Sequence, residues 1–184
     1  MVIAYHIIFT TYGTWLPNDP RGSYSKAIYN AELALLGSIQ YGRQTPQPDL
    51  GALGRFRTAA IPTLSRSPYF INDNTRPLIA TAFSHDVRRL QLTVYACAIM
   101  NDHVHLVVLR SRYRVEYVMN QMKGRATSAL GLSQTPWTRG GWKVFLADEE
   151  AVHAAVAYVA GNPPAAGLAR QEWDFVQALP PRGA

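Results

Sequence analysis

The sequence predicts an α+β fold built on an antiparallel sheet, with helices packed mainly on one face of that sheet. Apolar residues recur at every second position in some segments and at helical spacing in others. These segments follow one another as strand, helix, strand, strand, helix, strand and helix. That order is typical of a ferredoxin-like sheet. We expect the third strand, which carries two histidines, to be central in it.

Residues 2–12 alternate in a way that predicts the first strand, with apolar residues on both faces, as expected for a central position. His6 lies in it, and we expect a structural role for this residue rather than a place in a site. Residues 23–67 carry a poor signal, with a short helix expected at 31–39. We interpret this segment as an insertion into a single domain that spans residues 1–184.

The remaining elements follow in order. A helix is expected at 77–90, because Asn72, Asp73, Asn74 and Thr75 offer N-caps and Pro77 suits a first turn. A strand follows at 91–100, a helix at 113–130 and a strand at 142–146. Asp148 caps the last helix, which we expect to stop at Gly161-Asn162-Pro163.

Composition indicates the compartment and the kind of partner. No apolar run approaches the ~20 residues of a membrane span, and the N-terminus lacks the basic-then-apolar pattern of a signal peptide, so a cytoplasmic protein is expected. A single cysteine, Cys97, excludes a disulfide framework. The formal charge is +6, and all 18 basic residues except Lys26, Lys123 and Lys143 are arginine. Arginine pairs well with phosphate, which favours a nucleic-acid partner; a GC-rich genome would also enrich arginine.

The segment 100–109 is the most informative of the chain. Alternate residues of a strand share a face, so His103 and His105 project side by side. Two neutral imidazoles at this spacing can converge on one divalent ion. The alternative is a pair of half-buried polar residues on an exposed sheet face. The other face of this strand carries Val104, Leu106 and Val108, which we expect to point into a core.

A second motif closes the last predicted helix. Tyr158 and Asn162 are four residues apart, so they lie on one face of its final turn. An aromatic residue that merely covers the sheet edge is the alternative for Tyr158.

Together, His-x-His on a strand and Tyr-x-x-x-Asn-Pro at the end of a helix resemble the HUH single-tyrosine transposases. The closest group is the REP-associated tyrosine transposases, which the segments 10–17, 123–125 and 141–146 also resemble. The resemblance covers roughly residues 1–20 and 68–170. It implies Mg²⁺ or Mn²⁺ on His103 and His105, with Asn162 as a third ligand. It also implies that Tyr158 attacks single-stranded DNA beside a hairpin and forms a 5′-phosphotyrosine.

Five residues are predicted to contact DNA. Lys123 and Arg125 flank a glycine and suit a backbone clamp, although a solvated basic turn is the alternative. Trp137 and Arg139 lie in a loop that can stack on an unpaired base. Lys143 belongs to one of the segments that carry the resemblance.

Other functions fit the same residues. A catalytically silent domain, descended from a transposase, would bind DNA or RNA hairpins without cleaving them. A metal-dependent phosphodiesterase would use water in place of Tyr158. The sequence leaves the oligomeric state open between a monomer and a homodimer.

Overall fold

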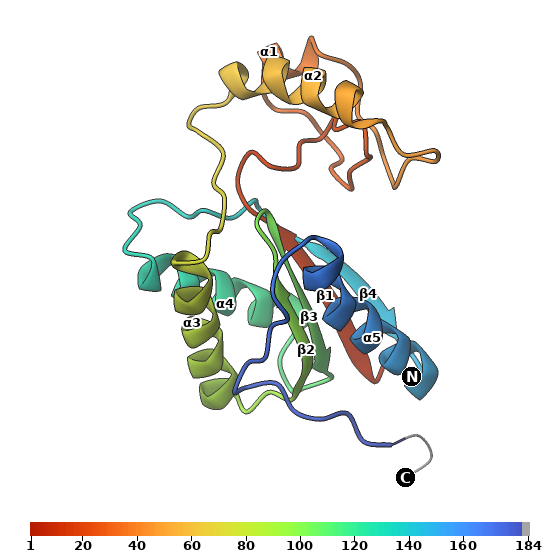
Figure 1. Ribbon diagram of the computed structural model, residues 1–184, viewed down its shortest axis with the longest axis vertical. Helices are drawn as coiled ribbons and strands as arrows, with labels where there is room; N and C mark the ends of the chain where they lie inside the picture. Colours follow the sequence, from red (N-terminus) through yellow and green to blue (C-terminus); the bar gives the residue numbers. More distant parts are fainter. Residues whose placement is uncertain (182–184) are drawn as a thin grey trace. The chain divides into compact units, whose positions relative to one another are not determined.

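The computed structural model describes residues 1–181. The chain divides into two compact units (Figure 1). The sheet unit consists of Met1–Thr10 and the chain from Ile71 onward, and the second unit is Thr11–Phe70. No helix within the described residues has the length and apolar character needed to span a bilayer.

The sheet unit contains four antiparallel strands in the order β2-β3-β1-β4. The strands are β1 (Ala4–Thr10), β2 (Val94–Ile99), β3 (His103–Leu109) and β4 (Trp142–Leu146). This architecture confirms the predicted α+β fold. The strand with the two histidines, β3, lies between β2 and β1 and is central, as predicted. The first strand is also central.

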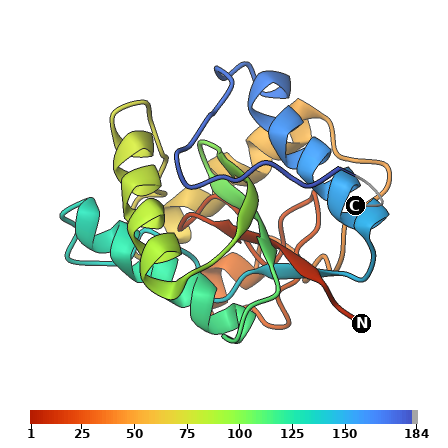
Figure 2. The ribbon, with the colours of Figure 1, turned by 90° about the horizontal axis from the view of Figure 1, so that it is seen from below.

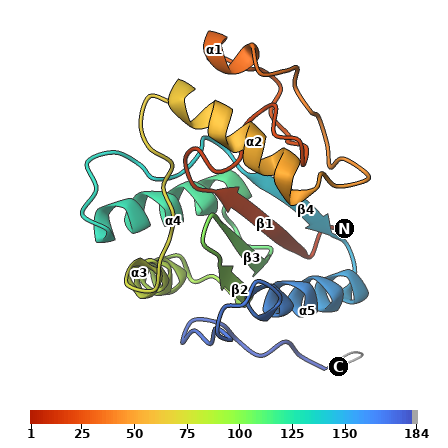
Figure 3. The same cartoon turned by 45° about the horizontal axis from the view of Figure 1, so that its top comes forward.

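Helices cover both faces of this sheet, two on one side and one on the other. The helices α3 (Thr75–Leu90) and α4 (Val115–Ala129) pack together on one face, and α5 (Glu149–Ala165) lies against the other (Figures 2 and 3). On the α3–α4 side, Phe9 and Leu106 are buried with Phe83 and Met122. The apolar face of β3 therefore faces this core, as its alternation predicts.

The face covered by α5 is part core and part polar. Ala4, Ala98 and Val107 of the strands form a buried cluster with Val152 and Val159 of α5. The same sheet face carries three histidines in a row beyond this cluster. Burial of the apolar stripe of α5 thus holds the helix across the histidines.

Helix α5 continues past its predicted end. It runs through Pro163 and Pro164 to Ala165, although proline has no N–H for a helical hydrogen bond. The Ala166 N–H closes the final turn by donating to the carbonyls of Asn162 and Pro163. Pro163 is buried, which favours this continuation; the Gly161-Asn162-Pro163 sequence alone predicts that the helix ends.

The chain beyond α5 returns along the edge of the sheet. Val176 forms a parallel bridge with Val94 of β2, and Gln177 donates its N–H to the Val94 carbonyl. The Gln171 side chain donates to the Ile99 carbonyl and accepts from the Ile99 N–H. The C-terminal segment therefore satisfies backbone groups of an edge strand that would otherwise be open to other chains.

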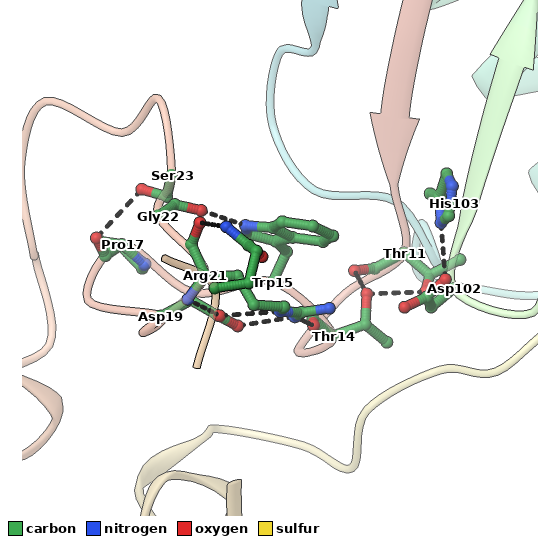
Figure 4. A network of polar contacts seen from close by, with 11 residues as sticks. Thr11, Thr14, Trp15, Pro17, Asp19, Arg21, Gly22, Ser23, Asp102 and His103 are labelled. Atoms are coloured by element: carbon green, nitrogen blue, oxygen red, sulfur yellow. Dashed lines mark hydrogen bonds and ion pairs between the residues drawn. The ribbon is translucent and has the colours of Figure 1, made fainter. Parts of the chain in front are cut away.

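The Thr11–Phe70 unit contains α1 (Ala31–Ala34), α2 (Leu50–Ala60) and a short 3₁₀ helix at Ile61–Thr63. Only the first four residues of the helix expected at 31–39 are helical. The Arg21 guanidinium lies 3.7 Å from the centre of the Trp15 ring and forms an ion pair with Asp19 (Figure 4). The segment 23–67 falls within this unit, and its status as an insertion stays a prediction.

Candidate functional site

Four polar side chains form a hydrogen-bonded row on the α5 face of the sheet. Asp102 Oδ1 lies 2.6 Å from His103 Nδ1 (Figure 4). His103 Nε2 lies 2.9 Å from His105 Nε2, and His105 Nδ1 lies 2.9 Å from His6 Nε2. The row therefore links a carboxylate to three imidazoles through both nitrogens of His103 and of His105.

Strand geometry explains why these residues meet. His103 and His105 are two residues apart on β3 and project from one face, as predicted. In the antiparallel register, His105 pairs with Ile8, and His6 pairs with Val107. His6 is thus the diagonal neighbour of His105 on the same face, within reach of a ring-to-ring hydrogen bond. Asp102 comes from the turn that leads from β2 into β3.

Burial keeps two of these imidazoles neutral. His105 is 4% exposed, and burial, followed by the neighbouring His103 and His6, lowers its pKa to about 2. Burial lowers the pKa of His6 to about 4. Both rings are therefore uncharged near pH 7, which is the protonation state that ligates metal ions.

The Nε2 atoms of His103 and His105 face each other, and neutral imidazole nitrogens are suitable ligands for a divalent cation. The two Nε2 atoms are 2.9 Å apart. Residues 1–181 contain no group of three or more histidine, cysteine, aspartate or glutamate side chains that could hold a metal ion. The remaining ligands of a cation on this pair would therefore have to be amide, water or phosphate oxygens.

Tyr158 of α5 lies against the histidines. The centre of its ring is 5.7 Å from that of His105 and 5.9 Å from that of His6, both in edge-on orientation. The side chain is nevertheless 55% exposed. The structure therefore brings the predicted nucleophile to the predicted metal ligands and leaves it accessible to a large substrate.

Asn162 lies one helical turn after Tyr158. Its side chain is half-buried, and in the described part of the chain its Nδ2 atom is buried without a hydrogen-bond partner. A buried amide group without a partner is costly, by about 1–3 kcal/mol. A half-turn of the amide about its last bond exchanges the nitrogen and the oxygen. Its oxygen would then take the buried position. The role of Asn162 as an oxygen ligand stays a prediction.

Two of the residues predicted to contact DNA have structural roles instead. Lys123 is 7% exposed, and its ammonium donates hydrogen bonds to the carbonyls of Thr138 and Gly140. Burial lowers the pKa of Lys123 to about 8. Trp137 is 3% exposed, packs edge-on against Phe9 and donates its indole N–H to the Lys123 carbonyl. We correct both predictions, because neither side chain offers a surface to phosphate or base.

The other three residues predicted to contact DNA lie nearer the surface. Arg125 forms an ion pair with the buried Asp86, and Lys143 forms one with Glu116. Arg139 is exposed in the loop before β4. Of the five predicted contacts, Arg139 is therefore the best placed to meet a DNA backbone.

Sequence reasoning missed two members of the polar row. It gave Asp102 no role in a site, and it expected only a structural role for His6. The signal for Asp102 was its position directly before His103. His6 could be found only by aligning two strands that are about a hundred residues apart.

A family model and two solved structures resemble this chain. Residues 60–159 match the model of a protein family described as "Transposase IS200 like". One solved structure with a similar fold is described as "Structure of the REP associates tyrosine transposase bound to a REP hairpin". The TM-score is 0.53 at 12% identity, over 94% of this chain and 74% of the other. A putative transposase from Deinococcus radiodurans R1 is 11% identical over 88% of this chain and 91% of its own, with a TM-score of 0.37. No curated protein sequence matches the chain.

Proposed function

Because the chain belongs to the IS200-like transposase family, we propose that it cleaves and transfers single-stranded DNA beside hairpins, with Tyr158 as the nucleophile. The observation that carries this proposal is the position of Tyr158, whose ring contacts His105 while more than half of the side chain is exposed. Tyr158 thus combines exposure with two neighbouring neutral imidazoles, those of His105 and His6. This combination favours attack on a large substrate held at the histidines.

His103 and His105 would hold a divalent cation, Mg²⁺ or Mn²⁺, and Asn162 would add an oxygen ligand. When bound, such a cation polarises the scissile phosphate and stabilises negative charge on the leaving oxygen. The protein's own side chains would orient the ligands and the nucleophile. Asp102 fixes the orientation of the His103 ring, and α5 holds the phenol of Tyr158 beside the bound phosphate.

The covalent step is a transesterification. The Tyr158 oxygen attacks phosphorus, and the bond between phosphorus and the 3′ oxygen breaks. The phenol loses its proton, and the released DNA end gains one as a 3′-OH. The other end stays attached as a 5′-phosphotyrosine. A 3′-OH can later attack this phosphotyrosine and restore a DNA strand, so no external energy source is needed.

The net charge of +6 supports a DNA partner, since phosphate contacts dominate the affinity of nucleic-acid-binding proteins. One protein of similar fold is described as bound to a REP hairpin. By extension, we propose hairpin-bearing single strands as the substrate of this chain. Exposed Arg139 is the proposed backbone contact that fits the structure best.

A trapping assay tests the proposal. The protein is incubated with Mn²⁺ and a pool of labelled single strands, each with one hairpin and random flanks. We expect a protein–DNA adduct that survives denaturing electrophoresis. Cleavage without an adduct would favour hydrolysis by water. Hairpin binding without cleavage would favour a catalytically silent binding domain.

A further inference from the structure

The His105 imidazole uses both of its ring nitrogens. Its Nε2 faces His103 Nε2 at 2.9 Å, and its Nδ1 faces His6 Nε2 at 2.9 Å. A neutral imidazole has one N–H donor and one bare nitrogen acceptor. The two contacts of His105 are therefore coupled, because a change of proton position on one nitrogen reverses the roles on the other.

With three neutral rings and no cation, the row has one consistent arrangement of protons that starts from Asp102. The Asp102 carboxylate accepts a proton from His103 Nδ1, so His103 Nε2 is bare. His105 Nε2 must then donate to His103, and His105 Nδ1 must be bare. In consequence, His6 Nε2 donates to His105.

A cation on the two Nε2 atoms reverses the second half of this row. A ligating nitrogen carries no proton, so the proton of His105 must lie on Nδ1. His6 Nε2 must then be bare to accept it, and the proton of His6 must lie on its own Nδ1. The His103 contact with Asp102 is unchanged.

We propose that His6 is a positioning residue for metal binding, which accepts the Nδ1–H of His105 and holds its Nε2 toward the cation. The inference rests on the proposed metal site at His103 and His105. His6 does for His105 what Asp102 does for His103, since metal-ligating histidines are oriented by an acceptor on the second nitrogen. The two ligands thus differ, because one is backed by a carboxylate and the other by a neutral ring.

The position of His6 suits this role. It lies in β1, which is hydrogen-bonded to β3 on one side and to β4 on the other. The side chain is 7% exposed, and the edge-on ring of Tyr158 packs against it. A paired central strand and a packed ring hold the acceptor in place, so its nitrogen stays aligned with His105.

Two substitutions separate the hydrogen bond from the packing. His6→Phe keeps a ring for Tyr158 but removes the acceptor. His6→Gln restores an acceptor oxygen near the position of Nε2. The probe is Mn²⁺ alone, titrated against the full chain and followed by the electron paramagnetic resonance of the free ion. We expect His6→Phe to bind Mn²⁺ about 10- to 100-fold more weakly, and His6→Gln to remain within about threefold of the wild type.

The proton positions give a second measurement. Nitrogen NMR on histidine-labelled protein should show His105 and His6 with the proton on Nε2 when no metal is present. Saturating Mg²⁺ should move both protons to Nδ1. His85→Phe, which changes an exposed histidine of α3, is the matched control and should alter neither result.

The outcomes distinguish this inference from the site on which it rests. If Mn²⁺ binding needs His103 and His105 but is unchanged in a folded His6→Phe variant, the role of His6 is overturned while the metal site stands. Equal loss in His6→Phe and His6→Gln also overturns it, because packing rather than the acceptor would then be responsible. If Mn²⁺ binding is indifferent to His103 and His105, the metal site itself falls as well.

Discussion

The Tyr158 ring meets the His105 imidazole edge-on, with ring centres 5.7 Å apart and planes at 87°. The contact joins the last helix to the central strand of the sheet. The same ring also lies edge-on against His6, with ring centres 5.9 Å apart.

The first prediction concerns the two proposed ligands. His103→Ala should abolish divalent-cation dependence together with cleavage, while hairpin binding mostly survives because other contacts carry it. The fold should tolerate the change, since the His103 side chain is partly exposed. Cleavage and filter-binding assays on the same DNA check this. A variant that cleaves at the wild-type rate in Mg²⁺ would place the metal site elsewhere.

His105→Ala should destabilise the fold more than His103→Ala does. His105 is 4% exposed and its two nitrogens face His103 and His6. Its removal creates a cavity and leaves the buried His6 without this partner, which we expect to lower the free energy of unfolding by about 1–3 kcal/mol. Urea denaturation of His103→Ala and His105→Ala compares the two. Equal loss in both variants would contradict the burial seen here.

The pH dependence of stability follows from the same burial. The pKa is about 4 for folded His6 and about 2 for folded His105, against 6.5 for an ordinary histidine. Between pH 6.5 and pH 4 the unfolded chain therefore binds more protons, and the metal-free protein loses stability as the pH falls. Between pH 7 and pH 5 we expect a loss of about 1–2 kcal/mol for each histidine. Denaturation curves at both pH values measure it.

The variant His6→Phe should lose only about half as much unfolding free energy between pH 7 and pH 5 as the wild type. The control His85→Phe should lose as much as the wild type. A wild-type protein with equal stability at pH 7 and pH 5 would contradict neutral, buried imidazoles.

The third prediction separates structural from DNA-contacting cations. Lys123→Met should lower the free energy of unfolding by about 1–3 kcal/mol, because the carbonyls of Thr138 and Gly140 lose their donor. Its effect on the salt dependence of DNA binding should be nil. Arg139→Ala should leave stability nearly unchanged and reduce the slope of log affinity against log salt by about 1. The opposite pattern would restore Lys123 as a phosphate contact.

The fourth prediction concerns the form of the substrate. The proposed substrate is an unpaired strand, so single-stranded DNA beside a hairpin should be cleaved and the same sequence as full duplex should not. Gel analysis of matched labelled substrates measures the ratio. Equal cleavage of both forms would reject the proposed mode of action.

Much of the architecture could be predicted from local patterns. The alternation of polar and apolar residues over 103–106 was enough to place His103 and His105 on one face and Val104 on the other. Likewise, the helical stripe and the Asp148 cap located α5, and therefore Tyr158. These features depend on periodicity along one segment, which the sequence displays directly.

Features that depend on distant partners could not be predicted in this way. Trp137 and Lys123 look like loop and surface residues, yet packing against β1 buries them. The hydrogen bond between His6 and His105 depends on the register of β1 against β3. The helix α2 lies in a segment with little periodic signal. In each case tertiary contacts decide what local preference leaves open.

The central claim is that Tyr158 is the nucleophile, and the most direct test is the trapping assay on Tyr158→Phe. The substitution removes one oxygen and keeps the ring that packs on His6 and His105. We therefore predict an unchanged fold, unchanged Mn²⁺ binding and hairpin binding, and no covalent DNA adduct. In the wild-type adduct, peptide sequencing should find the DNA on Tyr158. An adduct that persists in Tyr158→Phe and maps to another tyrosine would contradict the account.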